Sequence, residues 1–144
     1  MQTWKKTLFA TLILGAQLPA LANTPVTLYK NPNCGCCDSY AAYLETKGFD
    51  VKLVNTEDMA SIKHKYAVPE KLEGCHTALI GRYVFEGLIP AENIQRVLNE
   101  HRPIKGLSVP GMPSGAPGMP GAKSGPIHVY YLDPSSPPKV FASF

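Results

Sequence analysis

Apolar and polar residues follow one another in patterns that predict short strands alternating with helices. Runs rich in β-branched and aromatic residues predict strands, and apolar residues spaced by three and four predict helices. The predicted elements, in chain order, are a strand over 25–30, a helix over 37–47, a strand over 49–54, a helix from 59 to about 68, strands over 77–80 and 83–86, and a helix over 91–100. This order predicts an α/β fold in which helices pack on a central mixed sheet and the last two strands form a hairpin.

The composition and periodicity of the sequence change after the last predicted helix. Gly, Pro and Ser dominate 103–126 without a helical or strand period, so we expect an irregular loop stiffened by proline. Two short strands are expected around 127–132 and 139–141. The earlier elements follow the order of a thioredoxin-like fold. We therefore expect a thioredoxin-like domain over 23–102, with the Gly/Pro/Met-rich loop and C-terminal strands of 103–144 packed on the same domain.

The N-terminus has the three parts of a secretory signal. Basic Lys5 and Lys6 precede an apolar run over 7–16, and Ala20-Leu21-Ala22 supplies the small residues of a cleavage site. The apolar run is shorter than the roughly 20 residues that a membrane-spanning helix needs. We expect residues 1–22 to be removed as a signal peptide, which leaves 144 − 22 = 122 residues, enough for one domain.

The charge balance excludes some classes of partner. The chain has 14 basic and 11 acidic residues, and loss of the two signal lysines leaves 14 − 2 = 12 basic residues. A nearly neutral chain gives no argument for a nucleic acid or an anionic membrane as partner. No second apolar stretch approaches membrane length, so we expect no membrane association after cleavage.

Four cysteines remain in the mature chain, and their spacing is poor for a disulfide framework. Cys34, Cys36 and Cys37 lie within four consecutive residues, while Cys75 is far away in sequence. A bridge within the first three closes a very short loop and therefore stabilises little, and a bridge between neighbours needs a strained geometry. The pattern favours reactive or metal-binding thiols.

The first three cysteines follow a predicted strand and turn and lead into a predicted helix. Cys34 and Cys37 have the C-x-x-C spacing of a redox pair. A helix N-terminus favours a thiolate, which is the nucleophile of disulfide exchange and also a metal ligand. Gly35 permits a tight turn. Cys36 has no necessary part in simple disulfide exchange.

The second segment of interest is Cys75-His76, directly before the predicted strand at 77–80. Thioredoxin-like enzymes usually carry a cis-proline at this place, whereas this chain presents a sulfur and an imidazole. We expect both to face the first three cysteines. Such soft donors suit Cu(I), Zn(II) or an iron–sulfur cluster, and sulfurs this close favour bridging thiolates and more than one ion. A buried, unreactive Cys75 is the alternative.

A methionine repeat lies in the proline-rich loop. Pro110-Gly111-Met112-Pro113 recurs seven residues later, 117 − 110 = 7, around Met119. Thioethers are soft ligands that suit Cu(I), but methionine also anchors loops by apolar packing. The sequence leaves both roles open. His64, His101 and His128 are not predicted to be ligands.

These motifs together resemble the CopG-like periplasmic copper-resistance proteins, which have a thioredoxin-like fold. The likeness runs from about Val26 to Met119. It rests on four motifs: Asn31-Pro32-Asn33-Cys34-Gly35-Cys36-Cys37, Glu73-Gly74-Cys75-His76-Thr77, Gly87-Leu88-Ile89-Pro90 and Gly106-Leu107-Ser108-Val109-Pro110-Gly111-Met112-Pro113. The resemblance implies a periplasmic protein that binds several copper ions through bridging cysteines and serves copper tolerance. It implies as ligands Cys34, Cys36, Cys37, Cys75, His76, Met112 and Met119.

Three functional hypotheses follow. The first is a copper-binding protein that stores copper or cycles it between Cu(I) and Cu(II), which would make it a copper oxidoreductase. The second is a thiol–disulfide oxidoreductase that uses Cys34 and Cys37 as catalytic residues without metal. The third is a chaperone that passes copper to other periplasmic copper-handling proteins.

Overall fold

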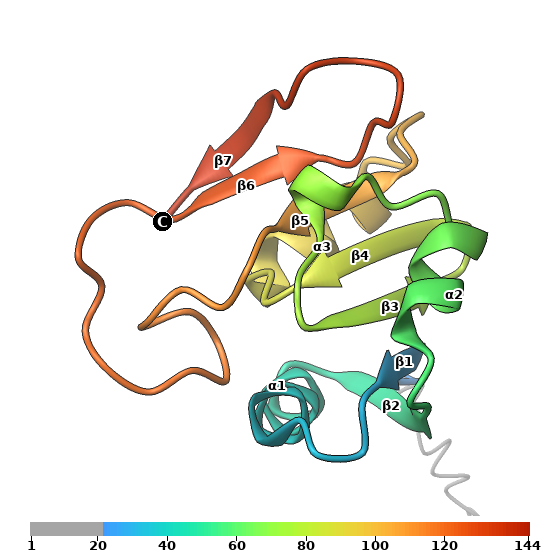
Figure 1. Ribbon diagram of the computed structural model, residues 1–144, viewed down its shortest axis with the longest axis vertical. Helices are drawn as coiled ribbons and strands as arrows, with labels where there is room; N and C mark the ends of the chain where they lie inside the picture. The colour runs from blue at the N-terminus through green and yellow to red at the C-terminus, as the bar shows by residue number, and fades with distance from the viewer. Residues whose placement is uncertain (1–21) are drawn as a thin grey trace, which may run out of the picture.

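The computed structural model describes residues 22–144 (Figure 1). Except for Ala22, the predicted signal peptide lies outside these residues. The elements, in chain order, are β1 (Thr24–Lys30), α1 (Gly35–Thr46), β2 (Phe49–Asn55), α2 (Met59–Lys65), the short 3-10 helix η1 (Glu70–Leu72), β3 (His76–Ile80), β4 (Tyr83–Gly87), α3 (Ala91–Asn99), β5 (Gly106–Val109), β6 (His128–Tyr131) and β7 (Val140–Ser143). Over 22–144 no helix is long and apolar enough to span a membrane.

The strands form a single mixed sheet in the order β2-β1-β3-β4-β5-β6-β7. β1 and β2 are parallel, β3 is antiparallel to β1, and β3 and β4 form the predicted hairpin. β5 then runs parallel to β4, while β6 and β7 add two antiparallel strands. The prediction of an α/β fold with a central mixed sheet is confirmed. The order of β1 to β4 is compatible with a thioredoxin-like arrangement.

The prediction that 103–126 is irregular throughout is wrong, because this region contains β5 (Gly106–Val109). All four residues of β5 are buried between β4 and β6. The strand has only four residues, and two of them, Gly106 and Ser108, match the composition of the surrounding loop, so its pattern is too short to reveal it. Gly106 itself is required by packing, since a Cβ there would lie 1.6 Å from the Val84 carbonyl oxygen.

Side chains from both faces of the sheet build the core. Phe85 points into the larger cluster, where it packs with residues of α1 and α3 such as Leu44 and Ile94. Its neighbour Val84 points to the opposite face and packs with Leu72 and others in a smaller cluster. This alternation follows from the pleat of a strand. Burial of a large apolar side chain contributes about 1.5–3 kcal/mol, so the larger cluster fixes the position of α1 against the sheet.

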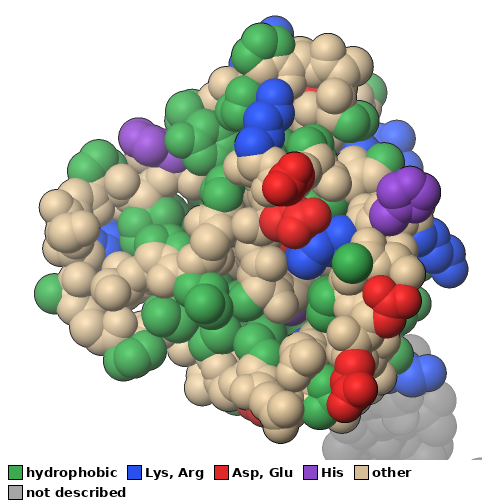
Figure 2. Space-filling view, viewed as in Figure 1, with side chains coloured by type: hydrophobic (Ala, Val, Ile, Leu, Met, Phe, Trp, Pro, Cys, Tyr) green, Lys and Arg blue, Asp and Glu red, His purple; other side chains and the backbone are tan. Residues whose placement is uncertain are grey.

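The surface is mixed in charge. On the face shown in Figure 2, acidic and basic side chains are interspersed, and neither sign covers the face. This agrees with the nearly equal numbers of basic and acidic residues expected after loss of the signal lysines.

Candidate metal centre

The four cysteines meet where α1 begins and β3 begins. Cys34 is the N-cap of α1, and Cys36 and Cys37 lie in its first turn. Because β1 and β3 are antiparallel neighbours, with Lys30 opposite His76, the end of β1 lies beside the start of β3. The chain leaving β1 toward α1 therefore passes next to Cys75. The four sulfur atoms lie within 4.8 Å of one another, the convergence that the sequence predicts.

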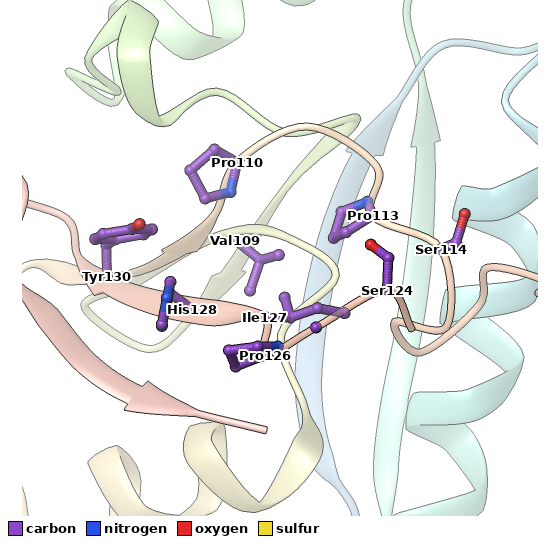
Figure 3. Close-up of a pocket in the computed structure, with 10 residues that line it drawn as sticks. Val109, Pro110, Pro113, Ser114, Ser124, Pro126, Ile127, His128 and Tyr130 are labelled. Atoms are coloured by element: carbon purple, nitrogen blue, oxygen red, sulfur yellow. The ribbon is translucent and has the colours of Figure 1, made fainter. Parts of the chain in front are cut away.

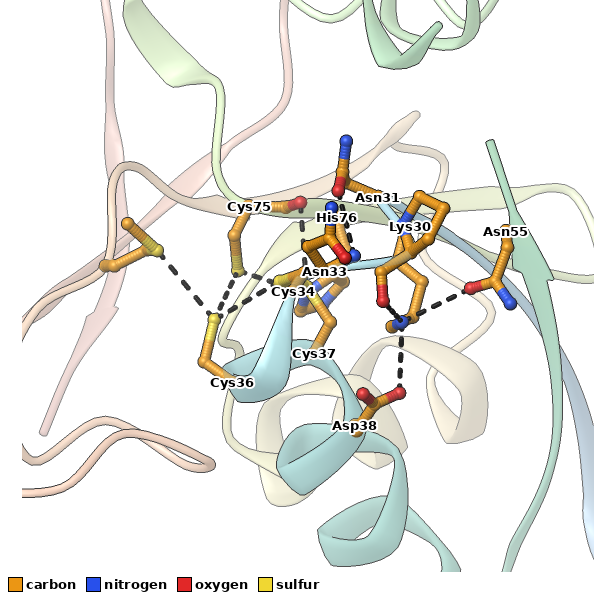
Figure 4. Close-up of a disulfide and its surroundings, with 12 residues drawn as sticks. Lys30, Asn31, Asn33, Cys34, Cys36, Cys37, Asp38, Asn55, Cys75 and His76 are labelled. Atoms are coloured by element: carbon orange, nitrogen blue, oxygen red, sulfur yellow. Dashed lines mark hydrogen bonds and ion pairs between the residues drawn. A yellow bond between two sulfur atoms is a disulfide. The ribbon is translucent and has the colours of Figure 1, made fainter. Parts of the chain in front are cut away.

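One pair of these cysteines is oxidised. Cys34 and Cys37 form a disulfide, and Cys36 and Cys75 are free thiols (Figure 4). The Cys36 sulfur lies 3.4 Å from the Cys34 sulfur and 3.6 Å from the Cys75 sulfur. Cys37 is fully buried, whereas the other three are partly exposed. The bridge spans three residues and stabilises the fold little, so the fold does not depend on its remaining closed.

The Cys75 thiol lies in a setting that resists loss of its proton. Burial and the neighbouring Cys36 raise its pKa to about 12. At neutral pH without metal, Cys75 is therefore protonated. A soft cation that binds the sulfur must displace this proton.

The His76 imidazole is buried and neutral. Burial and the positive charge of Lys63 lower the pKa of His76 to about 3. Its ring stacks on the ring of Tyr40 with centroids 4.6 Å apart, and its Nδ1 lies 3.3 Å from the Cys75 sulfur. Its Nε2 is buried without a hydrogen-bond partner among residues 22–144. A neutral imidazole keeps a lone pair for a metal, so the donor set of thiols and imidazole fits a soft ion such as Cu(I).

The two methionines of the repeat occupy different environments. The Met112 sulfur lies 3.8 Å from the Cys36 sulfur, and the Met112 side chain is 56% exposed. Met119 is partly buried and packs against the larger core cluster. The structure therefore places Met112 beside the cysteines and gives Met119 the contacts of a loop anchor.

The segment between β5 and β6, residues 110–127, carries the methionine repeat and is here called the methionine loop. Backbone contacts hold it next to the four cysteines. The Gly111 N–H donates to the Glu73 carbonyl at 2.9 Å, and Gly111 pairs with Gly74 in a short parallel bridge. Farther along the loop, Gly118 lies against the first turns of α1. A Cβ on Gly118 would come within 2.9 Å of the Cys36 carbonyl oxygen.

A buried ion pair supports the segment that carries Cys75. One Glu86 carboxylate oxygen accepts from the Gly74 N–H at 2.8 Å and the other from the Thr77 hydroxyl at 2.6 Å. Lys63 pairs with the same carboxylate. Burial raises the pKa of Glu86, although Lys63 and these hydrogen bonds oppose that shift. The carboxylate thus holds the backbone of Gly74 before Cys75 and the side chain of Thr77 after His76.

Neither this ion pair nor the role of Lys30 was predicted from the sequence. Lys63 follows Met59 by four residues and so lies on the same helix face, which was the available signal. Lys30 is buried, and its ammonium group lies 3.1 Å from an Asp38 carboxylate oxygen and 3.2 Å from the Asn55 side-chain oxygen. It ties the end of β1 to the first turn of α1.

The remaining histidines and a hollow beside the methionine loop lie apart from the sulfurs. His64, His101 and His128 are exposed. A hollow of about 380 Å³ separates the methionine loop from β6 (Figure 3). Its lining includes Val109, Pro113 and Tyr130 but no cysteine.

Comparison with known proteins gives the family. Residues 72–119 match a family model described as a protein of unknown function, DUF411, a segment that includes Cys75, His76 and both methionines of the repeat. No curated protein matches the chain. Two solved structures, titled copper resistance protein CopG, form 1 and form 2, each align with a TM-score of 0.77 and 33% identity, over 85% of this chain and 98% of theirs. With a relative this similar over almost its whole length, the chain belongs to the CopG family of copper resistance proteins.

Proposed function

We propose that this protein binds copper in the bacterial periplasm through its cysteine cluster and so contributes to copper resistance. The observation that carries the proposal is the convergence of four cysteine sulfurs within 4.8 Å. Thiolates are soft ligands that favour Cu(I). The titles of the two similar structures name copper resistance, which supports copper over other soft metals.

The cluster would hold more than one ion. Sulfurs separated by 3.4 and 3.6 Å around Cys36 are close enough for one thiolate to bridge two ions. The proposed ligands are Cys34, Cys36, Cys37 and Cys75, together with His76 and Met112, whereas the contacts of Met119 with the larger core cluster favour its role as a loop anchor. Full use of the cysteines requires that the Cys34–Cys37 disulfide be reduced. Bound copper would supply one-electron chemistry between Cu(I) and Cu(II).

The proposal includes export of the protein and assigns separate roles to two segments of the mature chain. The N-terminal pattern over 1–22 supports a cleaved signal peptide and a periplasmic location. Residues 23–102 would form the thioredoxin-like metal-binding domain. Residues 103–144 would add Met112 to the site and complete the sheet.

An anaerobic titration of reduced protein with Cu(I) tests the proposal. We expect more than one ion per chain, and a clear loss of capacity in Cys75→Ser because that change removes a central sulfur. His64→Ala is the matched control, since it removes an exposed imidazole on α2 outside the cysteine cluster. Binding of less than one ion, or full capacity in Cys75→Ser, contradicts the proposal.

A thiol–disulfide oxidoreductase is the second candidate, and the Cys34–Cys37 disulfide at the start of α1 favours it. In this case disulfide exchange needs only the C-x-x-C pair. Efficient reduction of a model disulfide that survives both Cys36→Ser and Cys75→Ser would support this function. The two surplus thiols beside the pair favour metal binding instead.

A further inference from the structure

The disulfide divides the four cysteines into two pairs with different abilities. In the form with Cys34 bonded to Cys37, here called the closed form, these two sulfurs have no thiolate to offer. The free thiols of Cys36 and Cys75 remain, with Met112 beside them. The closed form therefore still has soft donors that can bind a metal ion.

The spacing of these donors suits one ion. Two sulfurs bound to a tetrahedral ion at about 2.3 Å each lie about 3.8 Å apart. The Cys36 sulfur is 3.6 Å from the Cys75 sulfur and 3.8 Å from the Met112 sulfur. A sulfur and an imidazole nitrogen on the same ion lie about 3.6 Å apart, and the His76 Nδ1 is 3.3 Å from the Cys75 sulfur. In each of these three pairs the two donor atoms are already close to the spacing that they would have on a shared cation.

Access to this group of donors is open on the methionine side. Met112 is 56% exposed and Cys36 is partly exposed, whereas Cys37 and His76 are buried. In Figure 4 the contacts of the Cys36 sulfur reach both Cys34 and Cys75, so Cys36 links the disulfide to the donors outside it. An ion bound between Cys36 and Met112 would already lie at the edge of the full cluster.

We infer that the closed form holds a single Cu(I) ion between Cys36, Cys75 and Met112, and that reduction of the disulfide converts this site into the larger cluster. This inference rests on the proposed copper-binding function and adds a control of the number of bound ions. The redox state of one disulfide sets how many copper ions the chain carries.

Opening the disulfide takes two electrons and two protons, and a dithiol is the chemical class of reductant. A donor thiolate attacks the Cys34 sulfur, because Cys37 is fully buried. A mixed disulfide forms and Cys37 leaves as a thiolate that takes up a proton. The second donor thiol then displaces Cys34, so the donor ends as a disulfide and the protein gains two thiols. All four sulfurs, within 4.8 Å, can then share copper.

The test is a Cu(I) titration of the full mature chain in both redox states, without oxygen and against a coloured Cu(I) chelator. Closed protein is first shown to have its two free thiols per chain, and the thiol count is repeated after copper is removed. We expect one Cu(I) per chain in the closed form. After treatment with a dithiol and its removal, we expect more than one.

Variants separate the two sites. Cys34→Ser combined with Cys37→Ser should bind one Cu(I) whether or not a dithiol was used, since it mimics the closed form without a disulfide. Cys36→Ser should lose binding in the closed form, and His64→Ala should behave as wild type. Circular dichroism checks that each variant is folded, and wild type alone decides the result if the double variant is not.

Each outcome has a clear meaning. No copper in the closed form, with several ions after reduction, overturns the inference and leaves the proposed function standing. Equal capacity in both redox states overturns the switch. No copper in either redox state contradicts both the proposed copper-binding function and this inference.

Discussion

At the scale of single residues, the site depends on groups that never touch the sulfurs directly. Glu86 is fully buried and accepts from the Gly74 N–H and the Thr77 hydroxyl, on either side of Cys75 and His76. Lys63 pairs with this carboxylate, and burial together with the charge of Lys63 lowers the pKa of His76, which keeps that imidazole uncharged. Buried polar groups that are fully paired specify one geometry, and this network specifies the geometry of the segment that carries Cys75 and His76.

Removing one partner of this ion pair should destabilise the fold more than removing both. Glu86→Leu leaves Lys63 buried without a counter-charge, and we expect a loss of about 3 kcal/mol in the free energy of unfolding. Combining it with Lys63→Met should recover part of that loss, because it removes the unpaired charge but leaves the Gly74 N–H and the Thr77 hydroxyl without their acceptor. Urea unfolding of the two single variants and the double variant measures the coupling. Simple additivity of the two single effects would show that the pair is not coupled.

Copper binding should strengthen as the pH rises. The pKa of Cys75, raised to about 12, keeps this thiol protonated across the neutral range, and a bound ion must displace the proton. Affinity is therefore greatest at high pH and falls as the pH is lowered, by about tenfold per unit for each proton released. Competition titrations with Cu(I) at several pH values measure this slope. In Cys75→Ser we expect the slope to fall by one proton, and an unchanged slope would contradict the assignment.

At the scale of elements, the site is built where α1, β3 and the methionine loop meet. The antiparallel pairing of β1 with β3 brings Cys75 to the start of α1. The Gly111 contact with Glu73 fastens the loop to the same segment. Gly118 then allows the loop to approach α1 closely. The distance between Met112 and Cys36 is thus set by loop docking.

Two glycines of the loop provide a matched test of this docking. Gly118 and Gly121 have positive φ values of +84° and +89°, so alanine at either position carries a similar backbone strain. Only at Gly118 would the added Cβ collide with α1, within 2.8 Å of the Tyr40 nitrogen. We expect Gly118→Ala to lose about 1–3 kcal/mol more stability than Gly121→Ala, as overpacking does. It should also weaken Cu(I) binding more.

Chemical unfolding of the two glycine variants measures the loss of stability, and a Cu(I) competition assay measures the loss of copper affinity. If both lose the same stability and affinity, the close approach of Gly118 to α1 does not position Met112.

At the scale of the whole molecule, the sequence predicted most elements but not the way the C-terminal part enters the sheet. Apolar periodicity located the helices, and runs rich in β-branched and aromatic residues located the strands up to β4. β5 was missed because it has only four residues, two of them Gly106 and Ser108, and lies in a stretch dominated by Gly, Pro and Ser. The convergence of Cys75 with the other cysteines was predictable from element order. The Lys63–Glu86 pair was not, since it joins a helix to a strand 23 residues away.

Which cysteines are joined in a disulfide also could not be predicted from the sequence. Spacing identified Cys34 and Cys37 as a redox pair, but it did not say whether they are bonded. The structure joins them and leaves Cys36 and Cys75 free. The position of Met112 beside Cys36 likewise depends on contacts between segments about 40 residues apart, such as Glu73 with Gly111.

The most direct test is the copper content of the protein as cells make it. Wild type and Cys75→Ser would be purified without oxygen from the periplasm of copper-fed cells, and metal content would be measured together with thiols accessible to a labelling reagent. The proposed function predicts more than one copper ion per wild-type chain, protection of the thiols, and a marked loss of copper in Cys75→Ser. Wild-type protein free of copper, with its thiols fully reactive, would contradict it.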